Sequence, residues 1–187
     1  RYWEPYETQL VSNLLRPGMI FVDVGAHIGY YSLLAAKALK GNGRVFSFEP
    51  APENFLLLEQ NIELNNFSTI VKPENIALSN HMGEADLYLS EYNTGDHRIY
   101  PTNEEDDALF NSGIRRNALA RVPVATLDMY LESRDIDQVN LIKLDVQGAE
   151  LQALEGMRST LLASPQVILI TEFWPYGLTA NNASPQA

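Results

Sequence analysis

The chain has 187 residues, of which 45% are hydrophobic, 24 are acidic and 13 are Lys or Arg, and its net charge is −11. This length and apolar content predict a single domain over residues 1–187 and exclude global disorder. The acidic balance disfavours nucleic-acid binding, because phosphate contacts need a surplus of Lys and Arg. No apolar stretch approaches the roughly 20 residues that span a membrane. The chain has no Cys, which excludes disulfides and thiolate metal sites and suits a reducing compartment, so we expect a cytoplasmic protein.

Strand and helix patterns alternate along the chain. Apolar pairs four residues apart indicate a first helix at 3–15, and almost continuously apolar runs indicate buried strands. The further expected elements are strands at 19–24, 44–48, 69–72 with 76–78 in the same layer, 140–146 and 166–171, and helices at 29–39, 52–65 and 151–163. The alternation predicts an α/β fold whose core, 19–175, is a mostly parallel twisted sheet with helices on both faces.

The middle of the chain has a different pattern. Leu87 and Leu89 alternate with polar residues, as in a half-exposed strand. Val122 and Val124 do the same around Pro123, and a proline there suits an edge strand.

Two polar segments lack any periodic pattern. The stretch 91–117 is predicted to be a lid or binding loop, with disorder or a surface insertion as the alternatives. Its acidic run, 104–107, indicates a solvated loop more than a cation or partner site. We expect the tail, 178–187, to be frayed.

A glycine loop with the spacing D-x-G-x-x-x-G joins the first strand to the following helix. Because the loop follows the carboxyl end of a parallel strand, it predicts a site for a nucleotide-like ligand. Gly25 and Gly29 permit close approach of a ligand, while Asp23 and the free N–H groups of the helix suit the two ends of an amino-acid zwitterion. Ala26 and His27 lie in the same loop, and His27 is expected to contact the ligand or cap the helix. A tight turn with glycines for packing only is the alternative.

Glu49 ends the next strand, where an acidic side chain accepts hydrogen bonds from two ribose hydroxyls. A pyrophosphate prefers the closer G-x-G-x-x-G cradle and no facing acid, so an adenosine cofactor without a pyrophosphate fits better than a nicotinamide cofactor. Pro50 follows in the same turn. Asn75 and Ile76 follow the third strand, and they suit adenine contacts or ordinary loop packing equally.

A second cluster ends the strand at 140–146. Asp145 stands where open α/β sheets place their reactive groups. The charge of Lys143 inside an apolar strand needs a partner, for which Asp145 or Glu150 is suitable. A structural ion pair is the alternative to a direct role in the site.

His97 lies in the long polar loop and is a candidate general base, because histidine accepts a proton near neutral pH. The alternative is a solvated loop histidine. The three histidines are scattered without metal-ligand spacing, so we expect no metal.

These motifs occur in one order that closely resembles the FkbM family of S-adenosylmethionine-dependent methyltransferases, over about residues 6–175. They are D-V-G-A-H-I-G at 23–29, F-E-P at 48–50, N-I-A-L at 75–78, T-L-D at 126–128 and I-K-L-D-V-Q-G-A-E at 142–150. The resemblance implies a Rossmann-like class I methyltransferase fold and S-adenosylmethionine as cofactor. It implies that Asp23, Gly25 and Gly29 line the methionine part and that Glu49 holds the ribose. It also implies O-methylation of a hydroxyl, often on a sugar or a natural product.

The chain departs from the family pattern in two places. Gln147 stands where the family usually has Glu, and the segment 175–187 is too short and polar for the last two strands of the class fold. The expected chemistry uses His97 or Asp145 as the base, with Lys143 and Glu150 orienting the site. A non-catalytic domain that binds S-adenosylmethionine or a nucleoside, and a nicotinamide oxidoreductase, are the competing functions.

Overall fold

The computed structural model describes residues 3–90, 93–101 and 114–186. Five parallel strands form one sheet in the order β3-β2-β1-β7-β8. Their bounds are β1 Ile20–Val24, β2 Arg44–Phe48, β3 Val71–Glu74, β7 Leu141–Leu144 and β8 Ile168–Thr171. The strand order reverses direction between β1 and β7. In an open α/β sheet the ligand crevice lies at the carboxyl ends of the strands beside such a point.

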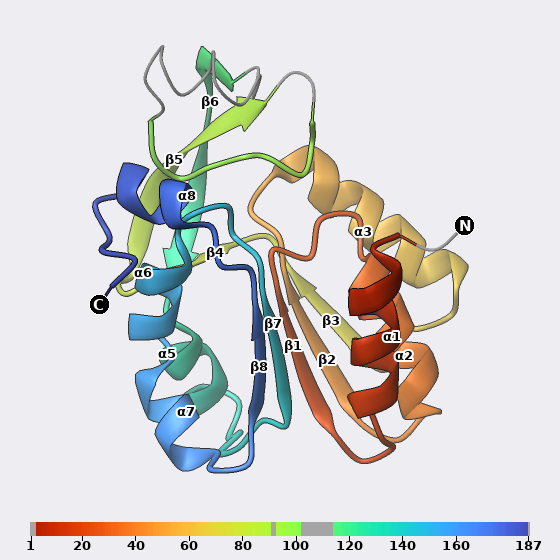
Figure 1. The fold of residues 1–187 in the computed structure, drawn as a ribbon. Helices are drawn as coiled ribbons and strands as arrows, with labels where there is room; N and C mark the ends of the chain where they lie inside the picture. The colour runs from red at the N-terminus through yellow and green to blue at the C-terminus, as the bar shows by residue number, and fades with distance from the viewer. Residues whose placement is uncertain (1–2, 91–92, 102–113, 187) are drawn as a thin grey trace.

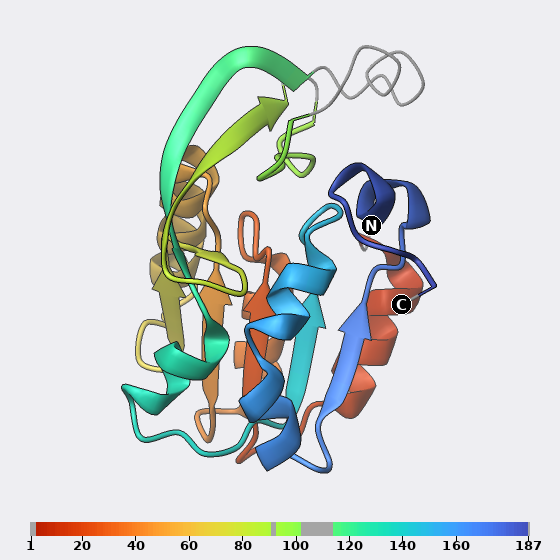
Figure 2. The same cartoon turned by 90° about the vertical axis from the view of Figure 1, so that its left-hand side faces the viewer.

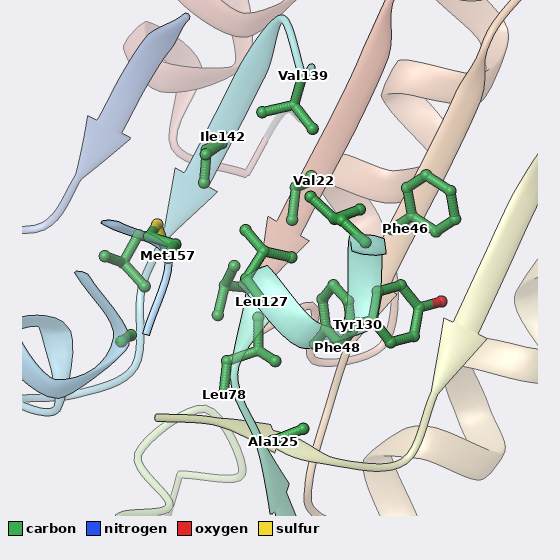
Figure 3. Packing of buried hydrophobic residues seen from close by; sticks show 14 of the residues in the cluster. Val22, Phe46, Phe48, Leu78, Ala125, Leu127, Tyr130, Val139, Ile142 and Met157 are labelled. Carbon is green, nitrogen blue, oxygen red and sulfur yellow. The ribbon is translucent and has the colours of Figure 1, made fainter. Parts of the chain in front are cut away.

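Helices cover both faces of this sheet (Figure 1), which confirms the predicted α/β architecture. One face carries α1 (Pro5–Leu14), α2 (Tyr30–Leu39) and α3 (Pro52–Leu64), and the other carries α5 (Leu127–Glu132), α6 (Glu150–Glu155) and α7 (Arg158–Ala163). Successive strand residues alternate between the two cores, so Phe21 packs on the α2 side and Val22 on the α5 side. Figure 3 shows Val22 and Ile142 packed near Leu127 and Met157, all of them fully buried.

Two elements differ from the sequence-based prediction because of local packing. The helix expected at 151–163 is divided into α6 and α7 at Gly156, where a Cβ would overlap the carbonyl oxygen of Ser79. The strand expected at 69–72 begins at Val71, because the N–H groups of Ile70 and Val71 donate to Phe67 in a turn.

A second sheet has three strands in the order β4-β6-β5, with bounds β4 Ala77–Leu78, β5 Gly83–Ser90 and β6 Ile114–Ala125. Two predictions were wrong here: 76–78 does not continue the layer of β3, and Pro123 lies in the middle strand rather than at an edge. The short β4 pairs only with Val124 and Ala125, so the missing N–H of Pro123 breaks no bond to it. Figure 2 shows this sheet arching over the carboxyl ends of the larger one.

The carboxyl-terminal segment is more ordered than expected. Helix α8 (Pro175–Ala180) follows β8, and Leu178 and Ala183 are 8% and 6% exposed, so the prediction of a frayed tail was wrong for this part. The apolar contacts of these two side chains hold the segment in place. No strand follows β8 within the described residues. Among all the residues that the structure describes, no helix is long and apolar enough to cross a bilayer.

Candidate functional site

A cavity of about 260 Å³ lies at the carboxyl ends of β1, β2 and β7. Segments that are far apart in the sequence contribute to its wall. They include Trp3 and Glu4, the glycine loop into α2, the turn after β2, residues 76–78, Leu87, residues 93–99 and the loop after β7. The cavity therefore brings together the two motif clusters predicted from sequence and part of the predicted lid.

The glycine loop is held by its own backbone contacts. Gly25 has φ 78°, and a Cβ there would overlap the carbonyl oxygen of Asp145, so only glycine lets the two loops touch. The N–H groups of Gly25 and Ala26 both donate to the carbonyl of Phe48 at 3.0 Å. These two N–H groups are therefore engaged within the protein, as the packing alternative requires. Gly29 has φ 92° and forms the N-cap of α2.

Asp23 lies behind the cavity wall. Its side chain is 1% exposed, and its Oδ2 accepts a 2.6 Å hydrogen bond from Ser32, whose hydroxyl also bonds Ser47 at 2.7 Å. Its Oδ1 is buried without a hydrogen-bond partner among the described residues. Burial raises the pKa of Asp23, and the ammonium of Lys143 opposes this effect. The structure thus places Asp23 beneath α2, and not on the cavity wall.

Glu49 lines the cavity and is 5% exposed. Its two oxygens accept one backbone N–H each, from His27 at 2.8 Å and from Ala51 at 2.9 Å. A carboxylate oxygen has two lone pairs, so the group can accept further donors beyond these two N–H groups. Burial raises the pKa of this carboxyl to about 7, while the two backbone donors and the side chain of Asn54 oppose the shift. The group is a fixed acceptor for two neighbouring hydroxyls.

Of the two residues that follow β3, Asn75 supports the neighbouring turn and Ile76 lies on the cavity wall. Asn75 donates to the carbonyls of Glu49 at 2.8 Å and Pro50 at 3.0 Å, so it holds the turn that carries the carboxylate. Ile76 and Pro50 line the cavity, together with Phe48, Leu78 and Leu87. These apolar side chains next to Glu49 suit the flat face of an adenine.

Lys143 and Asp145 form an ion pair at the opposite wall, with Nζ 3.0 Å from Oδ2. This confirms Asp145 as the partner of the buried lysine. Burial would lower the pKa of Lys143, but the carboxylates of Asp145 and Asp23 outweigh it and the pKa is raised. The ammonium also lies 4.9 Å from the ring of Tyr31. Lys143 is therefore a charged donor and not a base.

Gln147 joins two carboxylates across the loop after β7. Its Nε2 donates to Asp145 Oδ1 at 2.9 Å and to Glu172 at 3.3 Å. Partial burial and the charges of Asp145 and Glu150 raise the pKa of Glu172 to about 7. A glutamate at position 147 would add a third negative charge, whereas the amide gives a donor to each neighbour.

Glu150 supports the loop and does not line the cavity. Its Oε1 accepts the N–H groups of Val146 at 3.2 Å and Gly148 at 3.1 Å, and burial raises its pKa. This geometry is that of a residue that positions the loop, so Glu150 would orient the site through the loop and not as a wall residue.

The first part of the predicted lid closes over the glycine loop. Thr94 bonds the ring of His27 at 2.9 Å through its hydroxyl and accepts from Asn54 at 2.8 Å through its carbonyl. His97 lines the cavity, and its Nδ1 accepts the N–H of Ser90 at 3.0 Å. In the neutral ring Nε2 then carries the proton, and burial lowers the pKa of His97. His97 therefore presents a donor, which does not fit the expected role as base.

The rest of the predicted lid divides between described and undescribed residues. Residues 114–117 belong to β6 and are not loop. The acidic run 104–107 lies outside the described residues.

Four wall residues near the chain start were missed by the sequence reasoning. These are Trp3, Glu4, Tyr30 and Tyr31. The hydroxyl of Tyr31 donates to Glu4 at 2.7 Å, which ties the segment before α1 to α2. The sequence offered one signal for these wall residues, the two aromatic residues directly after the glycine loop. The segment before α1 joins them because α1 and α2 pack together on one face of the sheet.

The family model of the methyltransferase FkbM domain matches residues 23–180. The chain belongs to this family. The FkbM chain is 25% identical over 177 residues to methyltransferase sdnD of Sordaria araneosa, covering 84% of this chain and 67% of the relative. It is 24% identical over 157 residues to the 2-O-methyltransferase NoeI of Sinorhizobium fredii (strain NBRC 101917 / NGR234), covering 82% and 63%. It is 27% identical over 149 residues to the hexuronic acid methyltransferase AglP of Haloferax volcanii, covering 79% and 53%.

A solved FkbM methyltransferase from Methylobacillus flagellatus KT superposes with a TM-score of 0.54 at 19% identity, covering 90% of this chain and 40% of that one. This likeness confirms the Rossmann-like methyltransferase fold. The chain spans about half to two thirds of the length of these curated relatives.

Proposed function

We propose that this chain is an S-adenosylmethionine-dependent methyltransferase that methylates a hydroxyl oxygen on a sugar or another natural-product-like small molecule. The observation that carries the proposal is the single cavity that holds the Glu49 carboxylate on one side and Asp145 with Lys143 on the other. One side suits a nucleoside and the other side carries the charged groups that a proton transfer needs.

The wall residues fit the cofactor. The Glu49 carboxylate, held by two backbone N–H groups, suits the ribose hydroxyls, and Ile76 with its apolar neighbours suits the adenine. Ala26 and His27 of the glycine loop line the same wall and would contact the cofactor's central part. Asp23 acts from behind the wall, through the packing of α2. When bound, the cofactor supplies a sulfonium methyl that is already reactive.

Asp145 is the base in this proposal. Its two oxygens are fixed by Lys143 and Gln147, and the carboxylate lies on the cavity wall. It accepts the proton of the acceptor hydroxyl at a carboxylate oxygen, while the ammonium of Lys143 keeps the carboxylate in place. His97 donates its Nε2–H to a ligand oxygen and orients it.

The relatives support the acceptor class. NoeI is named as a 2-O-methyltransferase, and AglP is named as a methyltransferase of a hexuronic acid. An oxygen of a sugar-like molecule is therefore the proposed acceptor here. We also propose that residues 1–187 act as one domain, that nucleic acid is not a substrate and that the protein works in the cytoplasm, as its composition favours.

The test is transfer of a labelled methyl group from S-adenosylmethionine to a panel of neutral, amino and acidic glycosides. Asp145→Asn keeps the shape but removes the base, so kcat should fall by about 10²- to 10⁴-fold. The exposed Asp137, which is not on the cavity wall, gives the matched control Asp137→Asn with unchanged turnover. Equal turnover of the two variants would overturn the base assignment.

A non-catalytic domain that binds the cofactor is the second candidate, because His97, one of the two expected bases, presents a donor to the cavity. Calorimetry with S-adenosylhomocysteine separates the two. Binding without methyl transfer to any panel member would favour this second candidate, and absence of binding would exclude both.

A further inference from the structure

The charges on the cavity wall are unbalanced. Among the described wall residues, three are carboxylic acids, Glu4, Glu49 and Asp145, and Lys143 is the only Lys or Arg. The two wall histidines, His27 and His97, have lowered pKa values, and burial is the main cause for both. With Glu49 ionised, as hydrogen bonds from a ribose diol favour, the wall as described carries two more negative than positive charges.

The one Lys or Arg among the described wall residues is already engaged. Lys143 Nζ contacts Asp145 at 3.0 Å and lies over the ring of Tyr31 at 4.9 Å. Arg98, which follows a wall residue, is 2% exposed and pairs with Asp96 at 2.8 Å. An anionic group on a ligand would find no free cation among the described wall residues, and burying an unpaired carboxylate costs several kcal/mol.

A positively charged group on a ligand would find a suitable environment at this wall. Trp3, Tyr30 and Tyr31 line the cavity together with Glu4, and the hydroxyl of Tyr31 donates to the Glu4 carboxylate at 2.7 Å. Aromatic faces and carboxylates together are the surroundings that an ammonium group prefers. The same wall already holds one ammonium in this way, that of Lys143.

The cofactor does not remove the imbalance. S-adenosylmethionine carries one net positive charge, from its sulfonium, ammonium and carboxylate groups, so one negative charge of the wall is left over. We infer that the acceptor carries an ammonium group beside its reacting hydroxyl, as an amino sugar or an amino alcohol does. This inference rests on the proposed methyl transfer and narrows its substrate class.

The test compares three probes of one size that differ in charge. Methyl glycosides of 2-amino-2-deoxyglucose, glucose and glucuronic acid are titrated into the full chain saturated with S-adenosylhomocysteine, and binding is followed by calorimetry and ligand-observed NMR. We expect the amino glycoside to bind about tenfold more tightly than the neutral one, the change that about 1.4 kcal/mol of added attraction gives. The glucuronide should bind more weakly than both.

Glu4→Gln removes the proposed partner of the ammonium, and the preference for the amino glycoside should fall below about threefold. Tyr31→Phe takes the hydroxyl from Glu4 but leaves its carboxylate, so the preference should remain. Glu84→Gln is the matched control, since Glu84 pairs with Arg121 on the exposed surface of β5. It should leave the preference unchanged.

The outcomes of this test distinguish failure of the inference from failure of the proposed function. Binding of S-adenosylhomocysteine with equal or inverse preference among the probes, or with no binding of the amino glycoside, would overturn this inference alone. Failure to bind S-adenosylhomocysteine would overturn the proposed function and, with it, this inference. An amino preference that survives in Glu4→Gln would also overturn the assignment.

Discussion

The affinity for the cofactor should depend on pH through Glu49. Its carboxyl has a pKa of about 7 because it is buried, and a ribose diol donates two hydrogen bonds that favour the ionised form. Below pH 7 binding therefore requires loss of a proton from the protein. Each pH unit below 7 should weaken binding about tenfold, so the Kd for S-adenosylhomocysteine at pH 6 should be about tenfold higher than at pH 8.

The measurement is calorimetry between pH 5.5 and 8.5 in two buffers of different ionisation enthalpy, which counts the protons released. Glu49→Gln should bind weakly and with a flat pH profile. Glu172→Gln is the matched control, because Glu172 also has a pKa of about 7 but does not line the cavity. It should keep the slope of the unmodified chain.

The reasoning fails if the unmodified chain binds equally well at pH 6 and pH 8. It also fails if Glu172→Gln, and not Glu49→Gln, removes the slope. In that case the acid at the end of β8 would be the group that is linked to binding.

Three further predictions concern stability and are measured by urea unfolding. Gly25→Ala places a Cβ on a neighbouring carbonyl and should cost more than about 2 kcal/mol, whereas Gly41→Ala, with φ 82° and open space around it, should cost about 1 kcal/mol. Asp128→Ala removes acceptors for two backbone N–H groups and one hydroxyl at the start of α7 and should cost about 2 kcal/mol; a loss below 0.5 kcal/mol would contradict this capping role. Because the folded-state pKa of Glu49 lies above its usual 4.5, its stabilising effect is present below pH 4.5 and is lost as the pH rises to about 7. Across that pH range the free energy of unfolding of Glu49→Gln should therefore rise by about 3 kcal/mol relative to that of the unmodified chain. Parallel plots of unfolding free energy against pH for the two proteins would contradict this.

The backbone pattern was readable from sequence because buried parallel strands are apolar without interruption. The strand at 44–48 was predicted with its observed bounds, and the cavity side of Glu49 followed from its place at that strand's end. Side-chain direction was less accessible. Asp23 lies one residue before the end of β1 and alternates onto the α2 face, which the spacing D-x-G-x-x-x-G does not reveal.

Contacts that cross the fold were not predictable from local pattern. Glu4 meets Tyr31 only because α1 and α2 pack side by side. Pro123 is tolerated in a middle strand because the neighbouring strand β4 has only two residues and does not pair with it. The tautomer of His97 depends on one backbone N–H of β5. Such pairings depend on tertiary geometry. The periodicity of a single sequence does not show which distant residues come together.

The segment 93–100 is fastened at two places. Thr94 contacts the glycine loop and α3, while the ring hydroxyl of Tyr100 donates to the carbonyl of Gln147 at 2.8 Å and Arg98 stacks on Trp174 at 4.8 Å. A ligand that enters or leaves past this segment therefore has to loosen contacts to both halves of the sheet. Removal of Trp174 together with α8 would break the stacking contact of Arg98 and should loosen this segment on the β7 side of the sheet.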